Sequence, residues 1–186
     1  QMTKKFLIVG RGASGKTSIV NAACDKLGLK VIKSYATRPP RNEEEKTNPK
    51  DHIFITEEEF DQYKDDIAAY FELNGYRFFT TNSQLDDSDS WDVYAINPDA
   101  IPALKEKYKD KYQFVVVYVR TTQSIAKERA KKRSDDNAYE SRIKDEDEEF
   151  TAFEKSMAWD YHLLNNDTFE RAVETMCKFF KKEYNL

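Results

Sequence analysis

The chain has 186 residues, enough for one domain with small insertions and for a buried core. Hydrophobic residues make up 39% and charged residues 34%, which predicts a globular, cytoplasmic protein. The formal net charge of −4 excludes a general nucleic-acid binder, because such a protein needs a basic surface. Apolar runs such as Phe114–Val117 are far shorter than the roughly 20 residues that span a bilayer, so we expect no membrane partner. Cys24 and Cys177 lack metal-ligand spacing and are expected to be reduced thiols.

The first predicted elements alternate between strand and helix. Lys4–Val9 is short and apolar, as a buried parallel strand is, and Lys16–Leu27 is predicted to be a helix that ends at Gly28. Leu29–Ile32 is predicted to be a second short strand. Residues 34–52 are polar and contain three prolines, so we expect this stretch to be a loop.

A small mixed segment follows and interrupts this alternation. Thr56–Glu59 has the spacing of a capping box and predicts a short helix through about Lys64. Ala69–Phe71 and Tyr76–Thr80 are predicted to pair as antiparallel strands, because Asn74-Gly75 between them is a hairpin turn signal. We therefore assign residues from about 33 to 90 to an insertion.

Strands and helices alternate again in the second half of the chain. The predicted strands are Asp92–Ile96, Gln113–Val119 and Tyr161–Leu164. The predicted helices are Pro98–Lys109, Thr122–Arg133, a charged region at 135–157, and a final helix with one apolar stripe made of Phe169, Ala172, Val173, Met176, Phe179 and Phe180. The alternation predicts an α/β fold with a parallel sheet between helices, built from about residues 2–32, 91–121 and 151–186, with a charged helical segment at about 122–150.

Three of the five glycines fall within six positions near the start of the chain. They belong to a stretch with the spacing G-x-x-x-x-G-K-[ST]: Gly10, Arg11, Gly12, Ala13, Ser14, Gly15, Lys16 and Thr17. Glycine lets the backbone curl so that its N–H groups point at phosphate oxygens, and the helix that follows adds its positive N-terminus. We expect this stretch to bind the phosphates of ATP, with Lys16 reaching the β- and γ-phosphates and the Thr17 hydroxyl binding Mg²⁺.

A second basic motif follows the second predicted strand. Its sequence, SYATRPPR at residues 34–41, places Arg38 and Arg41 three residues apart around two prolines. In a doubly wound sheet this position lies at the carboxyl edge, near the phosphate loop. Guanidinium groups match phosphate oxygens, so the motif indicates a site for a second phosphate, and a solvated loop with incidental charge is the alternative.

These motifs resemble those of the guanylate kinase family, in the same order along nearly the whole chain. SYATRPPR and Lys50-Asp51-His52 resemble the family's S-x-T-T-R-x-P-R and G-x-D-Y, and residues 75–80 resemble G-N-Y-Y-G-[ST]. Residues 129–133 resemble the family's lid pattern R-L-x-x-R, and residues 160–167 resemble D-Y-x-[IV]-[IV]-N-D. The resemblance implies a P-loop kinase with a three-layer α/β/α core, a small mixed insertion that binds a nucleoside monophosphate, and a helical lid, acting as a monomer or homodimer.

The resemblance also implies roles for individual residues. The transferring phosphoryl group would be surrounded by Lys16, Arg129, Arg133 and Arg142, and the donor adenine would lie near Asn165. The acceptor phosphate would be held by Ser34, Arg38, Arg41 and His52, and the acceptor base would lie near Ala69, Thr80 and Asn97. The alternatives are an ordinary basic helix face for the lid arginines, a packed or surface histidine for His52, and a capping or turn asparagine for Asn165.

The chain departs from the family where the family recognises guanine. The family presents two carboxylates to the N1–H and 2-amino donors of guanine, and this chain has Ala69 and Asn97 at those positions. Glu72 is three residues from Ala69 along a strand, so it is expected to point to the opposite face. Ala95 replaces an aspartate that organises the metal, so Mg²⁺ would rely on Thr17, phosphate oxygens and water. Phe78 replaces a tyrosine that binds phosphate.

Three functions therefore remain open from the sequence. The first is a kinase that transfers the γ-phosphate of ATP to a ribo- or deoxyribonucleoside monophosphate, either GMP and dGMP or a nucleotide with a changed base. The second is a kinase of another small phosphorylated acceptor, such as a ribose phosphate. The third is a non-catalytic module that binds protein partners, against which the intact Lys16 and Thr17 argue.

Overall fold

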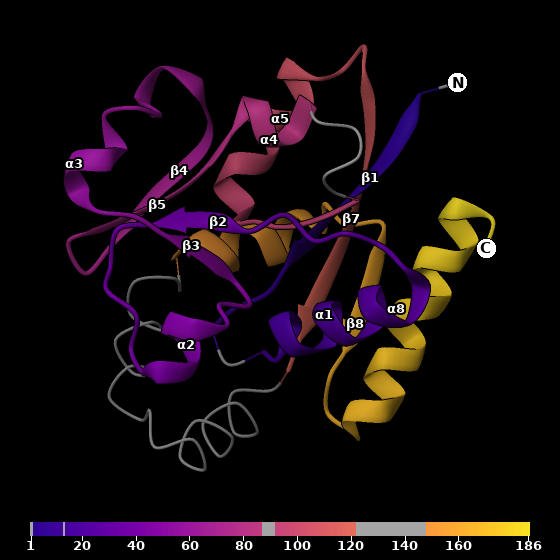
Figure 1. Ribbon diagram of the computed structural model, residues 1–186. Helices are drawn as coiled ribbons and strands as arrows, with labels where there is room; N and C mark the ends of the chain where they lie inside the picture. Colours follow the sequence, from indigo (N-terminus) through magenta and orange to yellow (C-terminus); the bar gives the residue numbers. More distant parts are fainter. Residues whose placement is uncertain (1, 13, 87–91, 122–147) are drawn as a thin grey trace. The chain divides into compact units, whose positions relative to one another are not determined.

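The computed structural model describes residues 2–12, 14–86, 92–121 and 148–186 (Figure 1). The chain divides into two compact units. We call residues 1–29 with 93–186 the core unit, and residues 30–92 the insertion unit.

The core unit is built on a four-stranded sheet in the order β6-β1-β7-β8, in which every neighbouring pair is parallel. Its strands are β1 (Thr3–Val9), β6 (Val93–Ala95), β7 (Tyr112–Arg120) and β8 (Tyr161–Leu164). The apolar run Phe6–Val9 is completely buried in β1, as expected of a strand with helices on both sides. The predicted α/β class and parallel sheet are confirmed.

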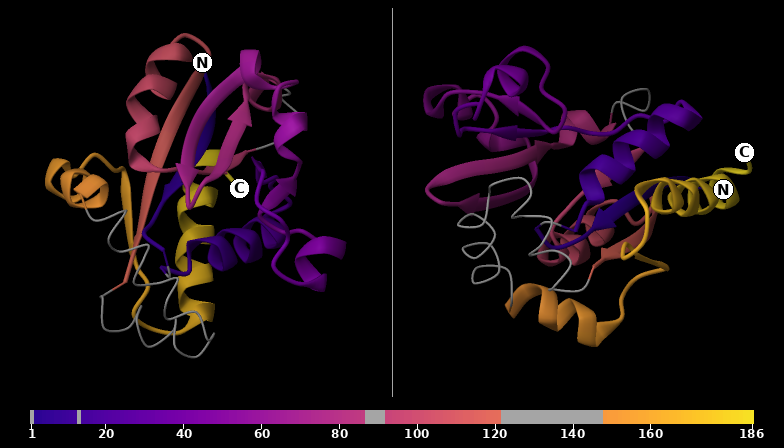
Figure 2. Two further views of the ribbon diagram at one scale, coloured as in Figure 1. Left: turned by 90° about the vertical axis from the view of Figure 1, so that its left-hand side faces the viewer. Right: turned by 90° about the horizontal axis from the view of Figure 1, so that it is seen from below.

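Helices cover both faces of this sheet (Figure 2). One face packs against α1 (Lys16–Leu27) and α8 (Phe169–Tyr184), where the rings of Phe6 and Phe180 lie 4.6 Å apart. The other face packs against residues 148–156, which are helical, and against the 3-10 helix η2 (Pro98–Ala100) with α5 (Ile101–Lys107). On that face Tyr118 contacts Phe153, with ring centroids 5.2 Å apart. The two faces follow from the alternation of side chains along each strand.

The helix ends agree with local sequence signals. α1 ends at Gly28, whose φ of 70° is left-handed, and the Thr168 side chain caps α8 by accepting a hydrogen bond from the Arg171 N–H. Of the predicted apolar stripe of α8, Ala172, Val173, Met176 and Phe180 are buried, Phe179 is half-buried, and Phe169 is exposed. The expectation of burial was wrong for Phe169, which is the first residue of the helix.

The insertion unit holds a second sheet, in the order β3-β2-β5-β4. Its strands are β2 (Ser34–Ala36), β3 (His52–Phe54), β4 (Ile67–Leu73) and β5 (Tyr76–Thr81), and its helices are α2 (Glu43–Thr47), α3 (Glu57–Phe60), η1 (Lys64–Asp66) and α4 (Asn82–Asp86). The predicted capping box at Thr56 and Glu59 is present. The predicted hairpin is present too, with φ values of 54° at Asn74 and 81° at Gly75.

Two expectations in this region were wrong. Leu29–Ile32 is not a strand, since only Val31 makes a bridge, and β2 begins at Ser34. The stretch expected to be a loop, residues 34–52, contains β2, α2 and the start of β3. β2 pairs with β3 and β5, which are distant in sequence, so no local pattern indicates it. α2 forms because the Asn42 side chain accepts a hydrogen bond from the Glu45 N–H.

Other predictions lie outside the described residues. These are the helix expected at 122–133 and the part of the charged region before residue 148. Among the helices in the described parts of the chain, none combines the length and apolar character needed to cross a membrane.

Candidate active site

The phosphate loop connects β1 to α1 and folds on its own backbone. The Ser14 N–H donates to the Arg11 carbonyl at 3.1 Å, and the Ile19 N–H donates to the Gly15 carbonyl at 3.2 Å. The Lys16 ammonium reaches back to the Gly10 carbonyl at 2.8 Å. The loop is therefore curled around its lysine, which is the arrangement that the motif predicts.

Two glycines are required here by space as well as by conformation. A Cβ at Gly10 would lie 2.7 Å from Ser14 Oγ and 2.9 Å from the Val119 carbonyl oxygen. Gly15 has a φ of +83°, and its Cβ would lie 2.7 Å from Asn165 Nδ2. Any side chain at either position would displace the loop or its neighbours.

The loop also presents polar groups that suit a bound phosphate. Ser14 Oγ is buried and has no hydrogen-bond partner within the described part of the chain. α1 is twelve residues long, begins after Gly15 without a side-chain cap, and has no acidic residue in its first turn. A buried hydroxyl and an uncapped helix N-terminus each gain from an anion, so this loop fits a nucleotide phosphate.

Asn165 supports the phosphate loop from the end of β8. Its side chain donates from Nδ2 to the Ser14 carbonyl at 2.8 Å, and its backbone N–H donates to the Arg120 carbonyl at 2.7 Å. The residue is almost completely buried. The structure therefore gives Asn165 a structural contact with the loop, and its role near an adenine stays a prediction.

An ion pair that the sequence did not indicate anchors Arg11 of the loop. Arg11 Nε lies 3.3 Å from Glu154 Oε1, and the guanidinium packs 5.4 Å from the ring centre of Phe150. The buried Tyr118 hydroxyl donates to the same Glu154 oxygen at 2.6 Å. Burial raises the pKa of Glu154, but the Tyr118 hydrogen bond and the Arg11 charge outweigh it and lower the pKa overall. Glu154 therefore stays ionised and holds Arg11 at neutral pH.

The described residues offer few protein ligands for Mg²⁺. Thr17 lies in the first turn of α1, where its hydroxyl could bind a cation that is shared with a nucleotide phosphate. Ala95, at the end of β6, pairs with Ile8, and its side chain has no atom that could bind a metal. The described residues contain no group of three or more His, Cys, Asp or Glu side chains that could hold a metal. These residues therefore fit a Mg²⁺ ion that would be bound through Thr17, phosphate oxygens and water.

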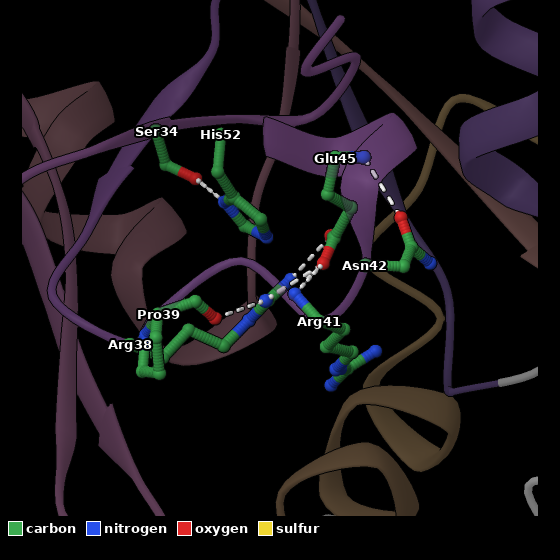
Figure 3. Close-up of polar contacts among 7 residues, drawn as sticks. All are labelled: Ser34, Arg38, Pro39, Arg41, Asn42, Glu45 and His52. Carbon is green, nitrogen blue, oxygen red and sulfur yellow. Dashed lines mark hydrogen bonds and ion pairs between the residues drawn. The ribbon is translucent and has the colours of Figure 1, made fainter. Parts of the chain in front are cut away.

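The arginine loop of the insertion unit is built around one carboxylate (Figure 3). Glu45 accepts from both terminal nitrogens of Arg38, at 3.0 and 2.8 Å, and from the Arg41 backbone N–H at 2.7 Å. The Arg38 hydrogen bond is the largest of the effects that lower the pKa of Glu45 to about 2. Arg38 is 8% exposed and its guanidinium lies 5.1 Å from the centre of the Phe54 ring. Arg38, which the sequence predicted to bind a phosphate, is thus held in one position by contacts within the protein.

Arg38 keeps donors for a ligand. It also donates to the Pro39 carbonyl at 3.1 Å, so three of its five N–H groups are used. Within the described residues, the Nε hydrogen and one Nη2 hydrogen have no protein acceptor. Figure 3 shows the Arg41 side chain pointing away from the Glu45 carboxylate.

Ser34 and His52 form a pair beside this loop. They are opposite each other in β2 and β3, and Ser34 Oγ lies 3.0 Å from His52 Nδ1. Burial, and then the charge of Arg38, lower the pKa of His52. The imidazole is therefore neutral at pH 7 and can offer a hydrogen bond but not a charge.

The residues expected at the acceptor base lie in different parts of the chain. Ala69 and Thr80 are opposite each other in β4 and β5, whereas Asn97 follows β6 in the core unit, where it precedes η2. Glu72 accepts a hydrogen bond from the Tyr70 hydroxyl, on the face that Ala69 does not share. Ala13 and the predicted lid residues Arg129, Arg133 and Arg142 lie outside the described residues.

Sequence reasoning missed Glu45 and Glu154. Glu45 belongs to the acidic run Glu43–Glu45, and the only local signal was Asn42, a good helix cap three residues before it. Glu154 lies 143 residues from its partner Arg11, and no spacing rule connects positions so far apart.

Comparison with known proteins gives the family of the chain. A sequence profile described as guanylate kinase matches residues 2–183. The guanylate kinase of Francisella tularensis subsp. holarctica (strain OSU18) is 25% identical over 187 residues, covering 95% of each protein. That of Thermotoga maritima is 28% identical, covering 96% of this chain and 86% of the relative.

A solved structure shows the same fold. The crystal structure of guanylate kinase from Anaplasma phagocytophilum superposes with a TM-score of 0.67 at 18% identity, covering 98% of this chain and 86% of that one. At this identity the likeness supports the fold, and the profile match over nearly the whole chain supports the family. The chain belongs to the guanylate kinase family.

Proposed function

We propose that this protein transfers the γ-phosphate of Mg-ATP to a nucleoside monophosphate. The observation that carries the proposal is the phosphate loop, which joins a parallel strand to an uncapped helix and buries an unpartnered hydroxyl at Ser14. Membership of the guanylate kinase family supports the same reaction.

On the donor side, Lys16 neutralises the phosphates of ATP. Its ammonium exchanges the Gly10 carbonyl, now at 2.8 Å, for phosphate oxygens. The Thr17 hydroxyl would help to hold Mg²⁺, which would supply charge neutralisation when it is bound. Arg129, Arg133 and Arg142 are proposed to complete the positive charge around the transferring group.

On the acceptor side, the arginine loop binds the monophosphate. Arg41 and the two remaining N–H groups of Arg38 supply charge, while Ser34 and neutral His52 supply hydrogen bonds. Glu45 fixes the plane of the Arg38 guanidinium. The acceptor is GMP, dGMP or a nucleotide with another base, since Ala69 and Asn97 carry no carboxylate for guanine.

The reaction is tested by ADP release from Mg-ATP in the presence of each common ribo- and deoxyribonucleoside monophosphate. We expect turnover with at least one of them, and we expect Lys16→Ala to lower kcat by about 10²-fold or more, because it removes charge from the transferring phosphate. Ribose 5-phosphate tests the smaller phosphorylated acceptor in the same assay. Release of no ADP with any acceptor, together with unchanged ligand binding by Lys16→Ala, would mean that the protein is not a kinase.

A further inference from the structure

The strand register of the insertion unit divides its sheet into two faces. Residues opposite each other on paired strands point to the same side, and neighbours along a strand point to opposite sides. The pairs of the first face are Ser34 with His52, Ala36 with Phe54 and with Phe78, Phe71 with Phe78, and Ala69 with Thr80. We call this side, which carries the Ser34–His52 pair, the Ser34 face.

The Ser34 face is basic and polar at one end. Arg38 packs its guanidinium over the ring of Phe54, at 5.1 Å, and Ser34 contacts His52. The proposed binding site of the acceptor phosphate therefore lies on this face.

The same face is aromatic further along. The rings of Phe71 and Phe78 are stacked, with centroids 5.0 Å apart and planes 9° apart, and Phe78 is in turn 5.4 Å from His52. Phe78 is 6% exposed, whereas Phe71 is 37% exposed. A buried ring thus holds an accessible ring flat, next to the polar end of the face.

The Ser34 face carries no acidic side chain among the described strand residues. Glu72 lies on the opposite face, where the Tyr70 hydroxyl donates to it. The described strand residues of this face therefore offer no carboxylate to the N1–H and 2-amino donors of guanine, the groups that distinguish guanine from other bases.

We propose that Phe71, backed by Phe78, is a stacking platform for the acceptor base, so that the protein accepts several bases and does not select guanine. This inference rests on the proposed function for the identity of the acceptor as a nucleoside monophosphate. Such a molecule is an anion at one end and a flat aromatic ring at the other, and the Ser34 face is cationic at one end and aromatic at the other. Stacking tolerates many bases, because each of them has a π-face.

Binding measured without ATP tests the platform. Isothermal titration calorimetry is run with GMP, AMP, CMP, UMP, TMP and ribose 5-phosphate against the native protein, Phe71→Ala, Phe71→Leu and Phe71→Tyr. We expect Phe71→Ala to weaken the binding of each accepted nucleotide by about 10-fold, and Phe71→Tyr to bind normally. Ribose 5-phosphate has no base, so its binding should not change. Phe71→Leu keeps apolar bulk against Phe78 and separates loss of the ring from loss of the fold.

Tyr70→Ala is the matched control. Tyr70 is adjacent to Phe71, is 38% exposed, and lies on the opposite face. We expect this substitution to leave nucleotide binding unchanged.

Two results would overturn the platform: equal nucleotide affinities in Phe71→Ala and the native protein, or native binding of GMP more than about 100-fold tighter than that of every other base. Absence of any nucleotide binding by the native protein would overturn it as well. Binding that depends on Phe71 without ADP release would refute the proposed kinase activity and leave the platform standing. ADP release that Phe71→Ala leaves unchanged would refute the platform alone.

Discussion

At the scale of single residues, Glu45 holds the arginine loop in its conformation. Its one carboxylate accepts a hydrogen bond from each terminal nitrogen of Arg38 and from the backbone N–H of Arg41. Removing it leaves a guanidinium that is 8% exposed without its partner. The loss of such a partner costs more than the pair itself contributes, because a buried charge stays unpaired.

We expect Glu45→Ala to lower the free energy of unfolding by about 2 kcal/mol, reduced from the value for a fully buried pair because the Glu45 side chain is 26% exposed. Glu45→Gln, which keeps an acceptor, should lose less. The folded pKa of about 2 lies below the unfolded value of roughly 4.3. The stabilisation is therefore complete above about pH 5 and disappears as pH falls from about 4 towards 2. Urea denaturation across this pH range measures it, and an equal acid dependence in Glu45→Gln would contradict it.

Gly15 is restricted both by its left-handed φ and by its close approach to Asn165, and substitutions can separate the two effects. We expect Gly15→Ala to lower both stability and ATP affinity, because its φ is +83° and the new Cβ would lie 2.7 Å from Asn165 Nδ2. Gly28→Ala is the matched control, since Gly28 also has a left-handed φ, +70°, and nothing lies within 4 Å of its Cβ position. The control should cost only the backbone strain of about 1–2 kcal/mol. Thermal denaturation and ATP titration compare the two, and equal effects would show that Asn165 does not limit the site.

At the scale of elements, the helix at 148–156 is connected to the phosphate loop by side-chain contacts. Arg11 extends from the loop to Glu154, and the buried Tyr118 of β7 fixes the same carboxylate. The loop is thereby held from the side opposite to α1. Its second residue should consequently keep one position, with the guanidinium turned towards Phe150.

A double-mutant cycle measures this tie. We expect Arg11→Ala and Glu154→Ala each to raise KM for ATP, and the double variant to show a coupling of about 1 kcal/mol in stability, since both side chains are only 21% and 26% exposed. The pair Arg171–Asp167, with side chains 75% and 58% exposed, serves as the reference and should couple by no more than about 0.5 kcal/mol. If the effects of Arg11→Ala and Glu154→Ala on stability are additive, the Arg11–Glu154 ion pair contributes no coupling energy.

Elements with complete local signals could be predicted from the sequence. α1 has a glycine at each end, α3 has its capping box, and the β4–β5 hairpin has Asn74-Gly75. The sequence signal for each of these elements therefore lies in a few adjacent residues. β2 differs, because it has three residues and exists through pairing with β3 and β5. Tertiary pairing of this kind is not visible in a short window of sequence.

At the scale of the whole molecule, the phosphate loop and the arginine loop belong to two different compact units. The phosphate loop is part of the core unit, and the arginine loop is part of the insertion unit. Each has its own sheet and its own internal contacts. Each should therefore respond to its own ligand.

Hydrogen exchange tests this separation. We expect ADP with Mg²⁺, added alone, to protect amides at residues 10–17, and a nucleoside monophosphate, added alone, to protect amides at residues 34–54. At 100 times its dissociation constant, either ligand should add about 2.7 kcal/mol to the free energy of unfolding. Protection of the phosphate loop by the monophosphate alone would contradict the assignment of the two loops.

The parts of the candidate site that could be predicted are those whose functional residues lie together in one motif. Lys16, Thr17, Arg38 and Arg41 lie within short motifs that are required by phosphate geometry. The residues that hold Arg11 of the phosphate loop, Glu154 and Tyr118, come from elements that are distant in sequence, and no motif contains them. The stacked pair Phe71 and Phe78 depends on strand register, which becomes known only when the hairpin is paired.

The carboxylate of Glu45 has a further consequence for selectivity among anions. With Glu45 ionised beside Arg38 and Arg41, the three side chains together carry one positive charge instead of two. We therefore expect the loop to bind small anions such as sulfate and inorganic phosphate weakly, because they bring charge and no other contact. A nucleotide brings a base and a sugar as well, so we expect it to bind this loop more tightly than a simple ion does.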